Sequence, residues 1–241
     1  MRRPADMAII IMSRVRRAVL FDAGNTLLLL EHAAIVSHLA SRGHAVSVAQ
    51  VEDAELRARV RLDDHLAAGV STESLDTRER YFRYILEPLG ITLEDEVAEI
   101  WQWRQTYNRP SGLYTRPDPD AAAALARIRA AGLVAGVISN SNGHAEALLA
   151  GAGLASGVDF VIDSGIVGVE KPDPRIFALG LEAAGVTPAE AVYVGDLYSV
   201  DVLGARAAGL DGILLDPRGY WGDRGCVRAT GLLDAVRLAL G

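Results

Sequence analysis

The sequence predicts an α/β fold in which a parallel sheet alternates with helices and carries a second, all-helical domain near its start. Two observations lead to this prediction. Five short apolar runs, each of a length suited to a buried strand, are separated by stretches with helical periodicity. Between the first run and the second, residues 28–119 keep the helical period without a clear strand pattern.

The five apolar runs are interpreted as strands of one parallel sheet, because such strands are buried on both faces and are apolar throughout. The predicted strands are Ala18 to Phe21, Val134 to Ile138, Phe160 to Ile162, Val192 to Gly195 and Ile213 to Leu215. An aspartate or a serine follows each run, although Asp163, after the third, is also interpreted as a plain strand cap. Ligands of parallel sheets bind outside the carboxyl ends of the strands, so these polar residues are expected to converge at one edge.

Helical segments alternate with the strands, as right-handed crossovers in a Rossmann-like parallel sheet require. The predicted helices are Asp120 to Ala131, Pro174 to Ala184 and Val200 to Ala208, and they end at Gly132, Gly185 and Gly209. Glycine directly after a periodic segment is a typical helix stop.

The long interruption after the first strand predicts an inserted all-helical domain. Its expected helices are Ala33 to Ser41, Val48 to Ala68, Thr77 to Leu89 and Leu93 to Tyr107. The segment Arg109 to Pro119 contains three prolines and is predicted to be the return linker. The expected organisation is therefore a frayed leader (1–16), a core domain (17–30 and 110–241) and a helical domain (31–109).

Composition and charge narrow the class of partner. A net charge of −7 and a pI near 5.3 argue against nucleic acid or an anionic membrane, since both favour a basic face. No apolar run approaches the roughly 20 residues of a membrane span. The only cysteine, Cys226, and the lack of a secretory signal pattern suit a reducing, cytoplasmic location. A small-molecule substrate is the expected partner, and the sequence does not indicate an oligomeric state.

The first candidate site residue is Asp22, which leaves the first strand into a turn built on Gly24 and Asn25. Both turn residues tolerate unusual backbone angles. Such a turn can present the carboxylate and several backbone amides to an anion, as covalent phosphoryl transfer through an aspartyl phosphate requires. The alternative interpretation is ordinary turn chemistry without a catalytic role.

Two further candidates follow later strands. Ser139 and Asn140 end the second strand, where a hydroxyl and free helix-start amides can hold phosphate oxygens, or where the two residues only cap a helix. Lys171 is the only lysine in a chain whose other basic residues, apart from histidine, are all arginine. A lysine near Asp22 would neutralise phosphate charge, and the alternative is a solvated loop residue.

A pair of carboxylates completes the set. Asp196 ends the fourth strand and Asp201 follows five positions later near a helix start. Magnesium is usually held by one or two carboxylates, waters and substrate oxygens, so Asp22, Asp196 and Asp201 with the Gly24 carbonyl are the expected Mg²⁺ ligands. Asp201 is alternatively a helix cap.

In this order and spacing, the motifs around Asp22, Ser139, Lys171 and Asp196 resemble the four motifs of the haloacid dehalogenase superfamily, and the insertion resembles its C1 helical cap. The resemblance implies a hydrolase, most often a phosphatase acting on a small phosphorylated metabolite. It also implies that Asp22 is the nucleophile and that Lys171 stabilises charge. Asp196 would help bind Mg²⁺, and the transferring group would contact Thr26, Ser139 and Asn140.

One position departs from the family pattern. Phosphatases of this superfamily usually carry a second aspartate two residues after the nucleophile, where it protonates the leaving group and later activates water; this chain has Gly24. Loss of such an acid and base typically slows a reaction by roughly 100-fold to 10,000-fold. We therefore expect a phosphatase that is slow or restricted to good leaving groups, or one that recruits a substitute such as Glu31, His32 or a cap residue.

Other functions remain open at this stage. A 2-haloacid dehalogenase also lacks the second aspartate, but dehalogenases of the superfamily need no metal, whereas Asp196 is retained here. Phosphonate cleavage would need a cap lysine, and residues 31–109 contain none. A catalytically weak protein that binds metal and phosphate for regulation is the non-enzymatic alternative.

Substrate selection in this superfamily usually depends on the cap. The aromatic residues Trp101, Trp103 and Tyr107 on the last predicted cap helix are candidate selectors, although ordinary packing explains them equally well. Trp101 and Trp103 are two positions apart and cannot share one helical face, so at most one of them should be buried.

Overall fold

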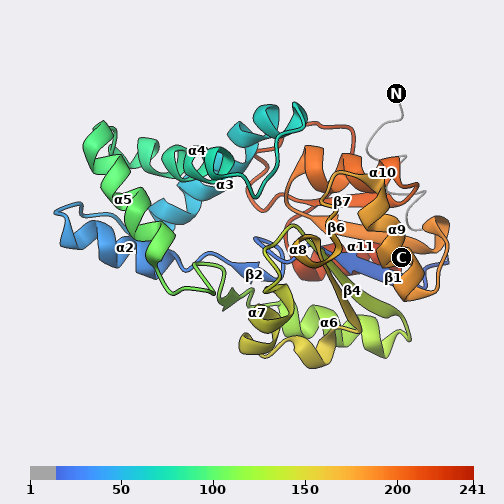
Figure 1. Cartoon of the computed structure of the whole chain (residues 1–241). Helices are drawn as coiled ribbons and strands as arrows, with labels where there is room; N and C mark the ends of the chain where they lie inside the picture. The colour runs from blue at the N-terminus through green and yellow to red at the C-terminus, as the bar shows by residue number, and fades with distance from the viewer. Residues whose placement is uncertain (1–14) are drawn as a thin grey trace.

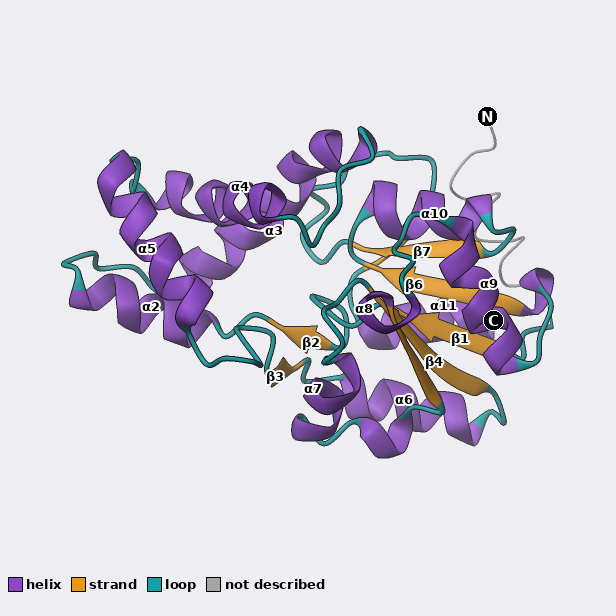
Figure 2. Ribbon diagram, viewed as in Figure 1, coloured by secondary structure: helices purple, strands orange, loops and turns teal. Residues whose placement is uncertain are grey.

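The core of the molecule is a six-stranded parallel sheet with helices on both faces (Figures 1 and 2). A computed structural model describes residues 15–241, so most of the predicted leader, residues 1–14, lies outside the described residues. The strands are β1 (Ala18–Phe21), β4 (Val134–Ser139), β5 (Phe160–Asp163), β6 (Ala191–Gly195), β7 (Asp211–Leu215) and β8 (Val227–Ala229). The spatial order is β5-β4-β1-β6-β7-β8, and all neighbours are parallel. The predicted α/β class is confirmed.

The sheet places β1 at its centre. Phe21 at the end of β1 is in register with Val137 of β4 and Val194 of β6, and the amide of Asp22 continues this pairing by donating to the Val194 carbonyl at 2.9 Å. Asp22 therefore emerges in the middle of the carboxyl edge, between two neighbouring strand ends.

Two hydrophobic layers cover the sheet. Alternate residues of β1 point to opposite faces, as strand geometry requires, so Val19 and Phe21 pack in one layer while Ala18 and Leu20 pack in the other. The first layer contains α6 (Ala121–Ala130) and α11 (Leu232–Leu240), with α7 (Ala145–Gly151) beside it. The second contains α9 (Pro174–Ala184) and α10 (Leu203–Ala207). The short helix α8 (Ser164–Val167) lies at the sheet edge after β5.

Residues 31–109 form four α-helices with a hydrophobic cluster of their own. They are α2 (His32–Ser41), α3 (Val48–Ala67), α4 (Leu75–Leu86), extended by a short 3-10 turn (Glu87–Leu89), and α5 (Glu94–Thr106). Ser47 begins α3 with a capping box that Gln50 completes. We call these residues the cap and propose to keep the predicted division between cap and core.

A small antiparallel ribbon joins the cap to the core (Figure 2). It pairs β2 (Leu28–Leu29) with β3 (Arg116–Pro117), one strand on each connection between the two parts. The sequence pattern did not predict this ribbon, because two residues are too few to show an alternating period. β8 was missed for the same reason, and the helix predicted from Val200 instead starts as a wide π-turn (Tyr198–Val202) before α10.

The core begins slightly before the predicted boundary. Arg16, which the sequence analysis assigned to the leader, is buried and donates to the carbonyls of Ala189 and Ala191 and to the Asp211 carboxylate. Residue 16 is therefore part of the core domain.

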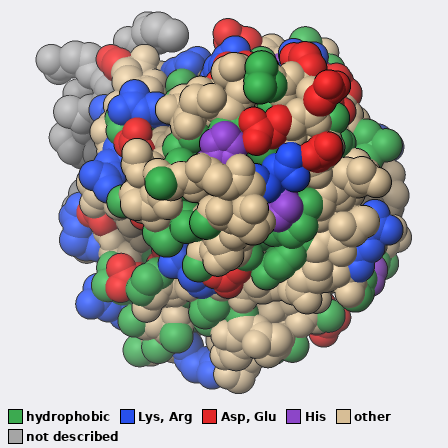
Figure 3. Space-filling view, turned by 90° about the vertical axis from the view of Figure 1, so that its left-hand side faces the viewer, with side chains coloured by type: hydrophobic (Ala, Val, Ile, Leu, Met, Phe, Trp, Pro, Cys, Tyr) green, Lys and Arg blue, Asp and Glu red, His purple; other side chains and the backbone are tan. Residues whose placement is uncertain are grey.

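The cap end of the molecule carries charges of both signs. Figure 3 shows acidic and basic side chains on this face, with hydrophobic side chains exposed between them. Some are paired across helices, such as Arg42 with Glu99 and Arg83 with Glu94. None of the helices in residues 15–241 has the length and apolar character needed to cross a bilayer.

Candidate active site

A cavity of about 230 Å³ opens between the carboxyl edge of the sheet and the cap. The core contributes residues from every motif that the sequence analysis selected, and the cap contributes arginines and aromatic residues. The polar and aromatic residues that line it include Asp22, Arg59, Glu73, Arg78, Tyr81, Arg104, Tyr114, Ser139, Asn140, Lys171, Asp196 and Asp201. The predicted convergence is therefore observed for Asp22, Ser139 and Asp196, whereas Asp163 and Asp216, which follow the other two predicted strands, do not line this cavity.

Lys171 is the charge centre of this cavity. Its Nζ donates to Asp22 Oδ1 at 2.6 Å, to Asp201 Oδ1 at 2.7 Å and to the Tyr193 hydroxyl at 2.9 Å, which uses all three ammonium protons. Tyr193 in turn donates to the Ile138 carbonyl. The lysine side chain is only 2% exposed, so it is a buried, fully bonded group and not a solvated loop residue.

Burial and pairing set the ionisation of these groups. Burial raises the pKa of Asp22 to about 6, against the opposing influence of Lys171. Burial works to lower the pKa of Lys171, but the carboxylates of Asp201 and Asp22 outweigh it and hold the pKa well above its ordinary value. At neutral pH the lysine is therefore charged and Asp22 is an ionised carboxylate.

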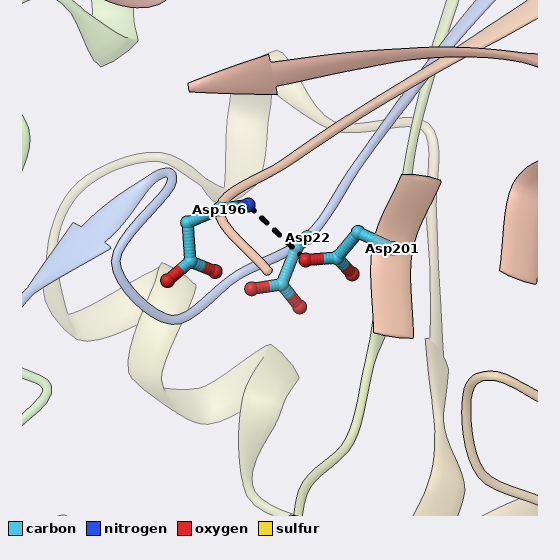
Figure 4. A group of neighbouring side chains, drawn as sticks. All are labelled: Asp22, Asp196 and Asp201. Carbon is cyan, nitrogen blue, oxygen red and sulfur yellow. Dashed lines mark hydrogen bonds between the residues drawn. The ribbon is translucent and has the colours of Figure 1, made fainter. Parts of the chain in front are cut away.

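Three carboxylates form a cluster that can hold a cation (Figure 4). One oxygen from each of Asp22, Asp196 and Asp201 lies within 4.8 Å of the others, and all three residues are buried. Asp196 Oδ2 is buried without a hydrogen-bond partner among residues 15–241. Burial raises the pKa of Asp196 well above its ordinary value, although Arg59 lowers it. A buried carboxylate oxygen that lacks a hydrogen bond and lies beside another carboxylate matches the donor set of a hard cation.

Asp201 has a different environment from Asp196. Its Oδ1 accepts from Lys171, and its Oδ2 accepts from the backbone amides of Asp196 at 3.1 Å and Leu197 at 2.9 Å. A side chain at Gly195 would place its Cβ 2.4 Å from Asp201 Cγ, so the Gly-Asp pair at the end of β6 is what allows this approach. Both Asp201 oxygens hold other parts of the site in position.

Asn140 connects Lys171 to the second motif. Its Oδ1 accepts from the Lys171 amide at 2.7 Å, and its Nδ2 donates to the Lys171 carbonyl and to Thr72 Oγ1 of the cap, both at 2.9 Å. Asp163, which the sequence analysis also interpreted as a strand cap, accepts from the amides of Gly143 and Ala145 and so fixes the loop after Ser139. Asn140 is thus placed to position Lys171.

The two predicted hydroxyl residues differ in position. Ser139 lines the cavity, and its hydroxyl makes only a long, 3.5 Å contact with the Asn140 carbonyl. Thr26 is buried and does not line the cavity, and within the described residues its hydroxyl has no hydrogen-bond partner. The structure therefore brings Ser139 to the site, whereas Thr26 is buried within the protein and does not reach the cavity.

The cap residues at the cavity are not the predicted ones. Trp101 is buried in the cap cluster and Trp103 stacks on His38 with ring centroids 4.1 Å apart, as the two-residue spacing predicted, but neither tryptophan lines the cavity. Tyr107 packs against Trp103 and is absent from the lining as well. The cap side chains that line the cavity come instead from α3, α4, the loop between them and the last turn of α5.

Arg59 is the most deeply placed of these cap residues. Its guanidinium donates twice to Glu55 at 2.5 Å, and its Nε lies 3.6 Å from Asp196 Oδ2. Tyr81 donates to the same Glu55 carboxylate. No sequence signal distinguished Arg59, because arginine is the ordinary basic residue throughout this chain.

A tyrosine ring lies beside the position two residues after Asp22. Glu31 and His32, the predicted substitutes for the missing aspartate, do not line the cavity. The nearest atoms to a Cβ built at Gly24 belong to the ring of Tyr114, at 3.6 to 3.9 Å. Tyr114 lies in the return linker and was not selected from the sequence.

The fold and the motif geometry define a class of hydrolase that comparison with known proteins identifies. Residues 16–209 match the family model of haloacid dehalogenase-like hydrolases, and the chain belongs to this family.

The names of individual relatives state different activities. The chain is 32% identical to human haloacid dehalogenase-like hydrolase domain-containing protein 3, over 83% of this chain and 81% of that protein. It is 42% identical to a phosphoserine phosphatase of Thermus thermophilus over 61% of this chain and 55% of the relative. It is also 35% identical to an (S)-2-haloacid dehalogenase of Xanthobacter autotrophicus over 80% of this chain and 72% of that enzyme. For several of the first relatives matched, the alignment spans only 35% to 55% of the relative's length.

Among solved structures, the crystal structure of a phosphatase of this family from Thermococcus onnurineus superimposes with a TM-score of 0.56 at 25% identity, covering 92% of this chain and 97% of that one. The agreement extends over cap and core.

Proposed function

We propose that this chain is a Mg²⁺-dependent phosphatase that transfers the phosphoryl group of a small phosphorylated metabolite to Asp22 and then hydrolyses the aspartyl phosphate. The observation that carries the proposal is Asp196 Oδ2, a buried carboxylate oxygen with no hydrogen bond in residues 15–241, beside the Asp22 carboxylate. A dehalogenase has no use for an additional buried carboxylate beside its nucleophile. A phosphatase uses it to bind a metal.

Asp22, Asp196 and the Gly24 carbonyl are the proposed metal ligands, and Asp201 completes the cluster through its hydrogen bonds to the Asp196 turn and to Lys171. When bound, Mg²⁺ supplies positive charge that offsets the phosphoryl oxygens. The residues present suit this ion, because their donors are oxygens and the site is small and buried.

The protein's own groups carry the remaining chemistry. Asp22 attacks phosphorus while Lys171 holds its Oδ1 and so aims the carboxylate. The Lys171 ammonium also compensates the charge of the transferring group, and Ser139 donates to one of its oxygens. Asn140 keeps Lys171 in place by bonding to both sides of its backbone.

The cap side of the cavity indicates the kind of substrate. Arg59, Arg78 and Arg104 line it, opposed among cap residues by Glu73. Arg78 lies 3.9 Å from Glu73, whereas Arg104 forms no ion pair within residues 15–241. Arg59 is already paired with Glu55, so Arg104 is the guanidinium that remains available on the cap side. That guanidinium favours a leaving group that carries a second negative charge, such as a carboxylate or another phosphate.

The proposal is tested with a panel of alkyl phosphates, acyl phosphates and 2-haloacids, each assayed with Mg²⁺ and with a chelator. We expect phosphate release that requires Mg²⁺ and is abolished in Asp22→Asn. Asp196→Asn should retain the fold and require a much higher Mg²⁺ concentration. Chloride release in the presence of chelator would instead establish a dehalogenase, which is the second candidate. Two observations favour that candidate: the 35% identity to a haloacid dehalogenase and the lack of an aspartate at position 24. Phosphate binding without turnover would establish a regulatory protein.

A further inference from the structure

The space beside Gly24 is filled by an aromatic ring. Gly24 is not among the residues with a positive φ, so an L side chain would meet no backbone strain there. The atoms nearest to its added Cβ are Cε1, Cδ1 and Cζ of Tyr114, at 3.6, 3.7 and 3.9 Å. The phenol ring of Tyr114 therefore occupies the side of the turn toward which a side chain at position 24 would project.

The Tyr114 hydroxyl accepts a hydrogen bond within residues 15–241 but does not donate one. Asn25 Nδ2 donates to the Tyr114 hydroxyl at 3.3 Å and to the Tyr81 hydroxyl at 3.1 Å. The Tyr81 hydroxyl donates a hydrogen bond to Glu55, whereas the Tyr114 hydroxyl donates to no acceptor within residues 15–241. Tyr114 lines the same cavity as Asp22 and Lys171, so a bound substrate can accept its hydroxyl proton.

We propose that Tyr114 is the catalytic acid and base that replaces the missing aspartate, an inference that rests on the proposed phosphatase function. As the bond from Asp22 to phosphorus forms and the bond from phosphorus to the leaving oxygen breaks, the phenol gives its proton to that oxygen. The resulting phenolate then takes a proton from the water that attacks the aspartyl phosphate. Phosphate leaves, and both Tyr114 and the Asp22 carboxylate are regenerated.

The surroundings of Tyr114 suit this cycle. Burial, with the nearby carboxylates of Glu55 and Asp196, raises the pKa of the phenol above its ordinary value, so the proton is present throughout the physiological range. The Asn25 amide that donates to its oxygen stabilises the transient phenolate. A phenol is a much weaker acid than a carboxyl group, so it helps strongly basic leaving groups most, such as the alkoxides of alkyl phosphates.

The test compares two leaving groups in Tyr114→Phe, which keeps the ring and removes only the hydroxyl. For an alkyl phosphate, kcat should fall by about 100-fold to 10,000-fold. For 4-nitrophenyl phosphate, whose leaving group needs no proton, the first-turnover rate of nitrophenolate release, which reports only the transfer to Asp22, should change by less than about threefold. Tyr84→Phe, at a tyrosine of α4 that does not line the cavity and whose ring contacts Arg61, is the matched control and should change neither rate.

A purely structural role for Tyr114 would lower both rates together, and that result, or two unchanged rates, would overturn the assignment. If the wild-type protein hydrolysed neither phosphate, the proposed function itself would be wrong. The two failures are therefore distinguishable.

Discussion

Arg59 Nε of the cap lies 3.6 Å from Asp196 Oδ2 of the core, and this contact joins the two parts of the molecule at the oxygen that we assign to Mg²⁺. Other contacts support the same arrangement, including Asp63 of α3 accepting from the Ser199 amide at 2.9 Å and Ser71 donating to Glu170 at 2.8 Å. The cap is thus held against the core by polar contacts, of which the one between Arg59 and Asp196 lies in the cavity itself.

The first prediction concerns the Arg59–Glu55 pair, whose side chains are 7% and 0% exposed. Arg59→Leu leaves the Glu55 charge buried and unpaired, so the free energy of unfolding should fall by about 3 to 5 kcal/mol. Replacing both residues by leucine should recover part of this loss, because the unpaired Glu55 charge is then removed as well. Urea denaturation measures both effects.

The matched control is Arg57→Leu, which breaks the exposed pair with Asp53 at the same spacing on the same helix. It should leave the urea midpoint nearly unchanged, since solvent screens exposed ion pairs. If the two substitutions lowered the urea midpoint equally, burial would not determine how much each ion pair contributes to stability.

The second prediction separates the charge of Lys171 from its shape. Lys171→Arg keeps the positive charge, but a planar guanidinium cannot place its donors on Asp22, Tyr193 and Asp201 within the buried space that one ammonium occupies. We expect kcat/KM to fall by at least about 100-fold. Steady-state kinetics with Arg175→Lys, at an exposed site on α9, provide the control. A nearly active Lys171→Arg protein would mean that charge alone is enough.

The third prediction concerns the pH dependence of Mg²⁺ binding. Burial raises the pKa of Asp22 from an ordinary 3.8 to about 6 in the metal-free protein. The ligand form is the ionised carboxylate, which is present above this pKa and lost below it. Mg²⁺ affinity should therefore weaken by up to about tenfold for each pH unit below 6, and burial of Asp196 acts in the same direction. Calorimetric titrations at about pH 5 and about pH 7.5 measure this, and equal affinities would refute it.

The fourth prediction concerns selectivity. Arg104→Ala should raise KM by about tenfold for phosphate esters with a second anionic group, since a hydrogen bond to a charged group contributes about 1.5 to 3 kcal/mol. Neutral alkyl phosphates should be affected much less. Arg42→Ala, on the outer end of the cap, is the control. Equal changes in KM for both kinds of ester would show that Arg104 does not contact the leaving group.

Local sequence patterns predicted the core elements closely. β1 and α9 have the predicted bounds, because an apolar run ending in aspartate and a Pro-Arg start with a Gly185 stop are local signals that tertiary contacts did not override. Asp22, Ser139 and Asp196 converge because they lie at the carboxyl ends of strands of one parallel sheet, whereas Lys171, selected as the only lysine of the chain, lies in the loop before α9. Asp22, Ser139, Lys171 and Asp196 could therefore be selected without knowledge of the structure.

The cap side of the cavity could not be predicted in this way. Arg59, Tyr81 and Tyr114 come from two helices and a linker, and they meet only when the cap lies against the core. Helical periodicity shows which residues share a face but not which face a separate domain will cover, so Trp101 and Trp103 were equally good candidates. The proline-rich linker gave no pattern from which to single out Tyr114.

The single lysine of this chain also makes the site easy to monitor. Apart from the terminal amine, Lys171 carries the only primary amine in the sequence, and its side chain is 2% exposed. An acylating reagent added to the folded protein should leave this nitrogen unmodified until the cap lifts or the chain unfolds. The rate at which the Lys171 side chain gains the mass of the acyl group would therefore report how often the cavity opens, without any introduced label.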